Sequence, residues 1–278
     1  MKCSLCGLRQ LLWGGACLAA AAAAFAAGAW LPLGRPACTQ ADLTPWPDTV
    51  ALSPAATAFA DSGAQGTPLP EKWVCLTFDD GPSKTTPAVL SALEAAGVPA
   101  TFFVVATGYN DQYLPLLTQA AAAGHQIALH SASHEYSDIY RSSSAYWQDL
   151  ALLKQRIAPY VEVESIRYLR FPGGSTNTVS RRYGGKGLMS QLKQEVEEKG
   201  YRWVDWNVCA EDAVGGKPSA DTVTHNVIRE TGSQTHCVVL MHDSSSTRTT
   251  AQALPDIIRW YADQGYAFLT VAQALPLG

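Results

Sequence analysis

From residue 72 to the end of the chain, short apolar runs alternate with longer segments of helical pattern. The runs predict strands at 74–78, 101–105, 126–129, 168–171, 201–206, 237–241 and 267–269. The longer segments predict helices at 86–96, 112–123, 144–158, 188–199, 220–229 and 251–264. Gly97, Gly124, Gly200 and Gly265 each follow a predicted helix, where a left-handed residue can end the helix before the next strand. This alternation predicts an α/β fold with a parallel, barrel-like sheet.

Polar residues with metal-binding chemistry follow two of the predicted strands. Asp79 and Asp80 come directly after the run at 74–78. His130 follows the run at 126–129, and His134 lies four positions further on. Because the carboxyl ends of parallel strands carry the chemistry in barrel folds, we expect these side chains to lie together. Two imidazoles and one carboxylate can hold zinc and leave a position open for water, so the pattern predicts metal-assisted hydrolysis.

Each part of this pattern also has a simpler interpretation when it is taken alone. An Asp-Asp-Gly-Pro sequence is typical of a solvated turn. Two histidines four positions apart can be a surface residue and a packed residue without a metal. The hydrolase interpretation is favoured because both sets follow buried, strand-like runs.

Five blocks in the same order make the chain resemble the polysaccharide deacetylases, which carry the NodB-homology domain of carbohydrate esterase family four. The blocks lie at 77–83, 130–134, 170–174, around Asp212 and at 240–243, and the resemblance covers residues 72–278. Within this family, the chain is similar to the peptidoglycan N-acetylglucosamine and N-acetylmuramic acid deacetylases. The resemblance implies an irregular, incompletely closed (β/α)7 barrel of the NodB type.

The resemblance implies that Asp80, His130 and His134 bind one divalent metal ion. Zn²⁺ suits this ligand set, and Co²⁺, Ni²⁺ or Fe²⁺ would fit similar ligands. Asp79 is then the general base that takes a proton from water, and its alternative role is to cap the turn. Arg170 matches the residue that pairs with the base and keeps it ionised. The alternative for Arg170 is a surface salt bridge at a strand end.

His242 follows an apolar run and matches the general acid that protonates the leaving amine, since an imidazole titrates near neutral pH. A packed structural histidine is the alternative. Asp212 is the expected partner of His242, with Asp205 as a competing match earlier in the strand. The N–H of Gly173 is the expected oxyanion donor, and Leu240 is expected to line the pocket for the acetyl methyl group. Many family members have tyrosine at position 173 and tryptophan after Asp212, so we expect a more open saccharide groove here.

The first 71 residues are assigned to an anchor and a tether. Lys2 and Arg9 precede an uncharged stretch at 10–34, whose length favours a transmembrane helix, so residues 1–35 are a membrane anchor or signal segment. Residues 36–71 are rich in Ala, Pro and Thr and are expected to be a flexible linker before the catalytic domain at 72–278. We expect a single-pass protein of the cell membrane with its catalytic domain outside the cytoplasm. Secretion after cleavage of the signal is the alternative.

The formal net charge of −4 and the lack of a basic, aromatic-rich patch give no reason to expect a nucleic-acid partner. The expected partner is an N-acetylated glycan, and the expected catalytic domain is monomeric. The expected reaction is amide hydrolysis that removes N-acetyl groups from peptidoglycan sugars. The alternatives are an O-acetyl esterase acting on xylan or another polysaccharide, and a wall-binding module that has lost catalysis.

Overall fold

The computed structural model describes residues 68–277. The predicted anchor at 1–35 and nearly all of the predicted linker at 36–71 lie outside these residues. Between residues 68 and 277, no helix combines the length and the apolar character needed to cross a membrane.

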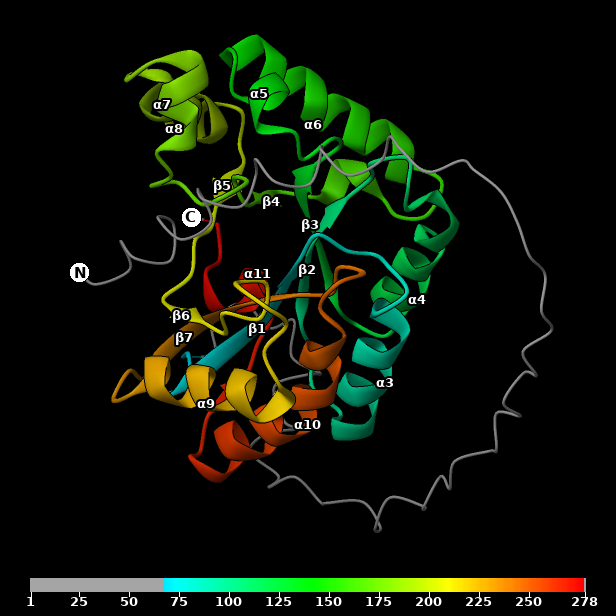
Figure 1. Ribbon diagram of the computed structural model, residues 1–278, viewed down its shortest axis with the longest axis vertical. Coiled ribbons are helices and arrows are strands. Elements are labelled where there is room, and N and C mark those ends of the chain that lie inside the picture. Colours follow the sequence, from blue (N-terminus) through cyan, green and yellow to red (C-terminus); the bar gives the residue numbers. More distant parts are fainter. Residues whose placement is uncertain (1–67, 278) are drawn as a thin grey trace, which may run out of the picture.

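Parallel strands form one curled sheet (Figure 1). In chain order they are β1 (Trp73–Asp79), β2 (Thr101–Val105), β3 (Gln126–Ser131), β4 (Tyr168–Leu169), β5 (Arg202–Trp203), β6 (Val208–Cys209), β7 (His236–His242) and β8 (Ala267–Phe268). Seven lie side by side in the order β5-β4-β3-β2-β1-β7-β6, and β8 pairs with the first two residues of β1. In the described part of the chain the two edge strands, β5 and β6, do not pair with each other. The predicted incompletely closed barrel is therefore confirmed.

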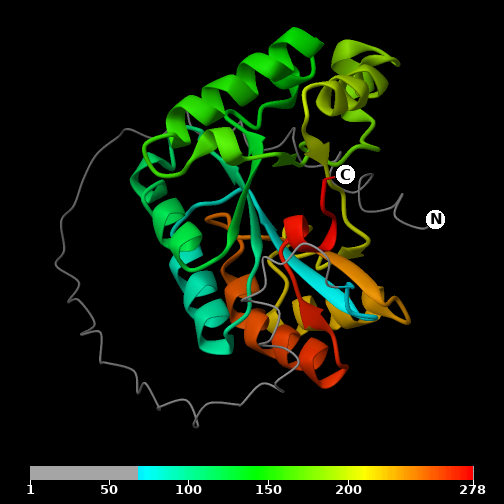
Figure 2. The same ribbon diagram turned by 180° about the vertical axis from the view of Figure 1, so that it is seen from behind.

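Most helices cover the outside of the curled sheet in both views, whereas the short α11 (Val271–Ala274) packs into the cluster inside the curl (Figures 1 and 2). The longer ones are α3 (Thr86–Ala96), α4 (Leu116–Ala122), α6 (Ser143–Ile157), α8 (Leu188–Glu198), α9 (Ala220–Thr231) and α10 (Arg248–Asp263). The short ones are η1 (Asp111–Tyr113), α5 (Tyr136–Ile139), η2 (Val163–Ser165), α7 (Val179–Gly184) and α11 (Val271–Ala274). The predicted helix at 112–123 is divided between η1 and α4. Pro115 stands between them, and a proline has no N–H to donate to the preceding turn, so the hydrogen bonds of one continuous helix are interrupted there.

The predicted strand at 201–206 is wrong as one continuous element. The chain pairs with β4 only at β5 and then crosses to β7, where it forms β6. The N–H of Val204 still donates to Leu169 O, at 2.9 Å, whereas the N–H of Asn207 already donates to Val238 O, at 3.2 Å. Strands of two residues are too short to show an alternating pattern in the sequence.

β1 is buried along its whole length, and its alternate side chains face opposite sides of the sheet. Leu76 and Phe78 belong to the main core under the helices, whereas Trp73 and Cys75 belong to a second cluster inside the curl. The same alternation places Asp79, at the end of the strand, on the inner face. The fold therefore places the carboxylate of Asp79 at the carboxyl end of the strands, on the inner side of the sheet.

The predicted helix ends are confirmed at the four glycines. Gly97, Gly124, Gly200 and Gly265 have φ of 64°, 83°, 74° and 77°. Residues with a side chain adopt this left-handed region at a cost, so glycine is favoured where a helix turns back toward a strand.

Candidate active site

Three strands bring predicted site residues to the same end of the sheet. Asp79 is the last residue of β1, and its partner in the β1–β7 register is His242, the last residue of β7. Asp80 follows directly with a φ of 67°. His130 lies in β3, and His134 follows it with a φ of 54°. Positive φ at two residues other than glycine is a strained arrangement, of the kind that clusters at functional sites.

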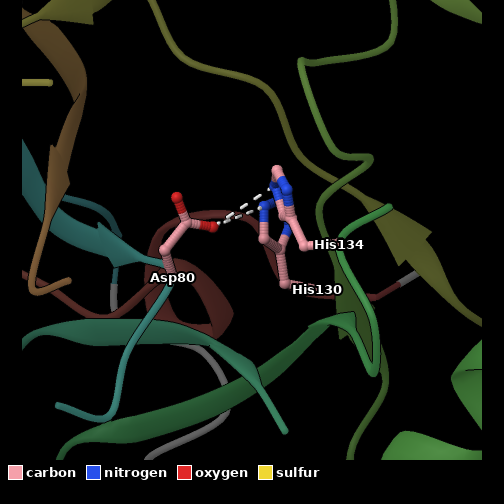
Figure 3. A group of neighbouring side chains, drawn as sticks. All are labelled: Asp80, His130 and His134. Carbon is pink, nitrogen blue, oxygen red and sulfur yellow. Dashed lines mark ion pairs between the residues drawn. The ribbon is translucent and has the colours of Figure 1, made fainter. Parts of the chain in front are cut away.

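Asp80, His130 and His134 form a cluster with the composition of a metal site (Figure 3). One ligand atom of each lies within 4.8 Å of the others. Asp80 Oδ1 is 3.5 Å from His130 Nε2 and 3.3 Å from His134 Nε2, and both imidazoles face the carboxylate. This Oδ1 atom is buried and has no hydrogen-bond partner. A buried carboxylate oxygen without a donor fits a ligand of a cation.

The protonation states in this cluster suit metal binding. His130 Nδ1 lies 2.7 Å from the carbonyl oxygen of Arg170, so Nδ1 carries the proton and the Nε2 lone pair faces the cluster. Burial lowers the pKa of His130 and outweighs the opposing effect of the Asp79 and Asp80 carboxylates. Burial alone would raise the pKa of Asp80, but the imidazoles of His134, His242 and His130 lower it overall. Neutral imidazole and ionised carboxylate are the ligand forms of these side chains.

Asp149, in α6, fixes the loop that carries His134, although nothing in the sequence near Asp149 marks it as a site residue. Asp149 Oδ2 accepts hydrogen bonds from Ser131 Oγ at 2.7 Å and from the N–H of Ala132 at 2.8 Å. Asp149 Oδ1 accepts from the N–H of Ser133 at 2.9 Å. Ser131 Oγ in turn accepts from the N–H of His134 at 2.8 Å. A buried carboxylate thus holds the whole turn between the two histidines.

Asp79 is paired with a fully buried arginine. Arg170 has 0% of its surface exposed and Asp79 has 4%. Arg170 Nη1 donates to Asp79 Oδ1 and to Thr77 Oγ1, both at 2.8 Å. Asp79 Oδ2 lies 3.9 Å from His130 Nε2, beside the cluster. This burial contradicts the surface salt bridge considered for Arg170.

Asp212, and not Asp205, contacts His242. Asp212 Oδ1 lies 2.8 Å from His242 Nδ1, while Oδ2 accepts from the N–H of His242 at 2.7 Å and from Thr250 Oγ1 at 2.6 Å. Asp205 instead accepts from the N–H and the hydroxyl of Ser175. Burial lowers the pKa of His242, but the charge and hydrogen bond of Asp212 outweigh it, so the pKa of His242 rises to about 10. The imidazole therefore carries a proton at neutral pH.

Two aromatic rings lie beside the glycines of the third block. Gly173 has a φ of 77°, and a Cβ on it would lie 3.3 Å from the hydroxyl oxygen of Tyr136. A Cβ on Gly174 would lie 2.9 Å from the ring of Trp206. The ring of Trp206 also lies 5.5 Å from the guanidinium of Arg170. Both rings come from other segments of the chain, so the sequence did not identify them as site residues.

A hollow of about 300 Å³ opens next to the cluster. Its lining includes Asp80 and His134 together with Tyr109, Asn110 and Tyr113. On the other side of β1, Leu240 is paired in register with Thr77 and is buried, with 2% of its surface exposed. The position of Leu240 is compatible with the predicted apolar lining, and its contact with an acetyl group stays a prediction.

Comparisons with known proteins point to one family. A family model described as polysaccharide deacetylase matches residues 66–186. The peptidoglycan-N-acetylglucosamine deacetylase of Bacillus cereus is 30% identical over 211 residues, which cover 75% of this chain and 90% of the relative. A bifunctional xylanase/deacetylase of Pseudobutyrivibrio xylanivorans is 27% identical, and the match covers 73% of this chain but only 30% of that longer protein. The catalytic domain of a peptidoglycan N-acetylglucosamine deacetylase from Eubacterium rectale superposes with a TM-score of 0.71 and 38% identity, covering 77% of this chain and 95% of that domain.

Proposed function

Because the chain belongs to the polysaccharide deacetylases of carbohydrate esterase family four, we propose that it is a metal-dependent hydrolase that removes N-acetyl groups from peptidoglycan sugars. The observation that carries this proposal is the cluster of Asp80, His130 and His134 beside two separate charged pairs. One pair is Asp79 with Arg170, and the other is His242 with Asp212. Amide hydrolysis needs a base for water and an acid for the amine, and each pair supplies one.

The three ligands would hold a divalent cation, for which zinc is proposed and cobalt, nickel or iron are alternatives. When bound, such an ion lowers the pKa of its water and polarises the acetyl carbonyl. Side chains of the protein carry out the proton transfers. Arg170 donates a hydrogen bond to Asp79 Oδ1 and fixes the carboxylate, so Oδ2 is free to accept the proton of the attacking water.

Departure of the sugar amine requires a proton. His242 is held through Nδ1 by Asp212, so its Nε2–H is the group that donates to the leaving nitrogen. The N–H of Gly173 is proposed to donate to the acetyl oxygen as negative charge develops there. Leu240 is proposed to contact the acetyl methyl group.

The proposed substrate is an N-acetylated glycan of the cell's own wall. Two of the similar proteins are described as peptidoglycan N-acetylglucosamine deacetylases. We further propose that residues 1–35 anchor the chain in the membrane and residues 36–71 tether a monomeric catalytic domain outside the cytoplasm, with secretion after signal cleavage as the alternative. Membrane fractionation of the full chain and of a variant without residues 1–35 tests the anchor, because only the full chain should sediment with membranes.

The reaction is tested by incubating the zinc-loaded chain with purified peptidoglycan and, separately, with acetylated xylan. Released acetate and new glycan amines are measured in both. Equal amounts of acetate and amine from peptidoglycan, lost in Asp79→Asn, are expected. Acetate without amines would refute the amidase, and absence of both products would support a wall-binding module that has lost catalysis.

An O-acetyl esterase is the second candidate, because one relative is described as a bifunctional xylanase/deacetylase. The same base and the same oxyanion donor would act on an ester. A leaving alcohol needs less protonation than a leaving amine, so His242→Ala should reduce amide hydrolysis more than ester hydrolysis. Acetate from xylan that is little affected by His242→Ala would favour this candidate.

A further inference from the structure

Tyr136 occupies a position beside both the histidine cluster and the third block. It is the first residue of α5, two positions after His134, and its ring centroid lies 5.4 Å from that of His134. Its hydroxyl oxygen lies 3.3 Å from the point where a Cβ on Gly173 would stand. The phenol therefore lies between a proposed metal ligand and the proposed oxyanion donor.

The position of this ring is fixed by its neighbours. Tyr136 stacks on Tyr140 with centroids 6.1 Å apart and planes 10° from parallel. Tyr140 is fully buried, and its hydroxyl donates to the carbonyl oxygen of Pro172 at 2.8 Å. Tyr140 also stacks on the buried Tyr146. The stack ties Tyr136 to the Pro172–Gly173 backbone, so the phenol and the loop have a defined geometry relative to each other.

Two hydrogen-bond donors lie unused at this point. Among residues 68–277, neither the hydroxyl of Tyr136 nor the N–H of Gly173 has an acceptor. Tyr136 is half-buried. A donor that is half-buried and fixed, yet has no protein acceptor, is available to a ligand oxygen. Two such donors side by side suit one oxygen atom that gains negative charge.

We propose that the Tyr136 hydroxyl contacts the substrate and donates a hydrogen bond to its acetyl oxygen, next to the N–H of Gly173. This inference rests on the proposed deacetylase function. The phenol keeps its proton throughout and acts only as a donor. Its contribution is largest when the acetyl oxygen carries the most charge, so it stabilises the transition state more than the bound substrate.

The variant Tyr136→Phe removes the hydroxyl and keeps the stacked ring. Loss of one oxyanion donor typically costs about 10²–10³ in kcat. Because the Gly173 N–H remains, we expect a loss of roughly 10- to 100-fold in kcat with little change in KM. Tyr183→Phe is the matched control, since Tyr183 is exposed on α7 and its hydroxyl should not matter. An unchanged kcat in Tyr136→Phe overturns the proposal, and so does an equal loss in the control.

Acetate binding gives a readout that does not depend on turnover. The Kd of acetate for the zinc-loaded chain is measured by NMR titration, and the Kd of zinc by calorimetry. Tyr136→Phe should weaken acetate binding several-fold, up to about tenfold for one lost hydrogen bond, and leave zinc binding unchanged. Equal acetate affinity, or a parallel loss of zinc affinity, would show a merely structural ring. If the wild type releases no acetate from any glycan, the proposed function fails, while the acetate affinities still decide the role of Tyr136.

Discussion

Replacement of Arg170 by methionine should cost several kcal/mol of stability, because it leaves a buried carboxylate without its partner. The side chain of Arg170 donates four hydrogen bonds. They go to Asp79 Oδ1 and Thr77 Oγ1 at 2.8 Å, to Val204 O at 3.0 Å and to Asp205 O at 3.2 Å. Methionine fills part of the same volume and supplies none of these donors.

The magnitude follows from the burial of the pair. Breaking a buried ion pair from one side costs about 3–5 kcal/mol. An isolated carboxyl group has a pKa of about 3.9, so protonating it at pH 7 costs about 4 kcal/mol. Protonation removes the unpaired charge, so this cost is an upper limit on the electrostatic contribution to the loss of stability. The two backbone carbonyls that lose a donor add ~1 kcal/mol each. We therefore expect Arg170→Met to lower the free energy of unfolding by about 4–6 kcal/mol at pH 7.

The assay is urea unfolding followed by far-ultraviolet circular dichroism at pH 7 and pH 5. Arg259→Met is the control, because Arg259 pairs with Asp256 on the surface of α10 with about half of each side chain exposed, and should cost under about 1 kcal/mol. Adding Asp79→Asn to Arg170→Met should recover part of the loss, since it removes the uncompensated charge. Equal effects of Arg170→Met and Arg259→Met at pH 7, or no smaller cost for Arg170→Met at pH 5, would refute the reasoning.

Three further predictions concern groups near the site and in the core. The pKa of His242 in the folded state is raised to about 10, so its pairing with Asp212 contributes stability that is complete below pH 6.5 and is lost as the pH rises to about 10. In Asp212→Asn, NMR titration should show a lower pKa for His242, and the free energy of unfolding should no longer fall over this pH range. Burial lowers the pKa of His125 to about 4, and its neutral Nδ1 accepts a hydrogen bond from the N–H of Ala100. The free energy of unfolding should therefore fall as the pH is lowered from 6.5 to 4. Urea unfolding of His125→Gln should show a weaker dependence on pH over this range. In Gly81→Ala the new Cβ would overlap the carboxylate of the buried Asp243 and displace the turn that carries Asp80. Calorimetry should then show zinc affinity reduced by roughly 10- to 100-fold. Gly187→Ala is the control and should bind zinc normally, because a Cβ on Gly187 would meet open space.

The sequence was informative where chemistry is local. The alternation of strands and helices predicted the barrel, and the positions of Asp80 and His130 at strand ends predicted that the two would meet. Both follow from parallel strands, because residues that end the parallel strands of one sheet lie at the same edge. The long helices were predictable for the same reason, since their signals lie within a few residues of each other.

Features that depend on distant segments were not predictable. Asp149 reaches the turn of the histidines from a helix that begins after it, and nothing local marks its carboxylate as a support. The sequence favoured Asp212 over Asp205 as the partner of His242, but it did not show that the chain leaves β5 after two residues and forms β6 against β7. Tyr136 meets Gly173 only through the packing of α5 on the third block.

The gap between the edge strands β5 and β6 affects which substitutions this enzyme can tolerate. Among residues 68–277, β5 and β6 do not pair with each other, and between them the carbonyl oxygens of Val204 and Asp205 accept hydrogen bonds from Arg170. The guanidinium of Arg170 thus binds the backbone at the edge of the sheet and also fixes the orientation of the proposed base. A substitution at position 170 would therefore alter the stability of this sheet edge and the position of the proposed base at the same time.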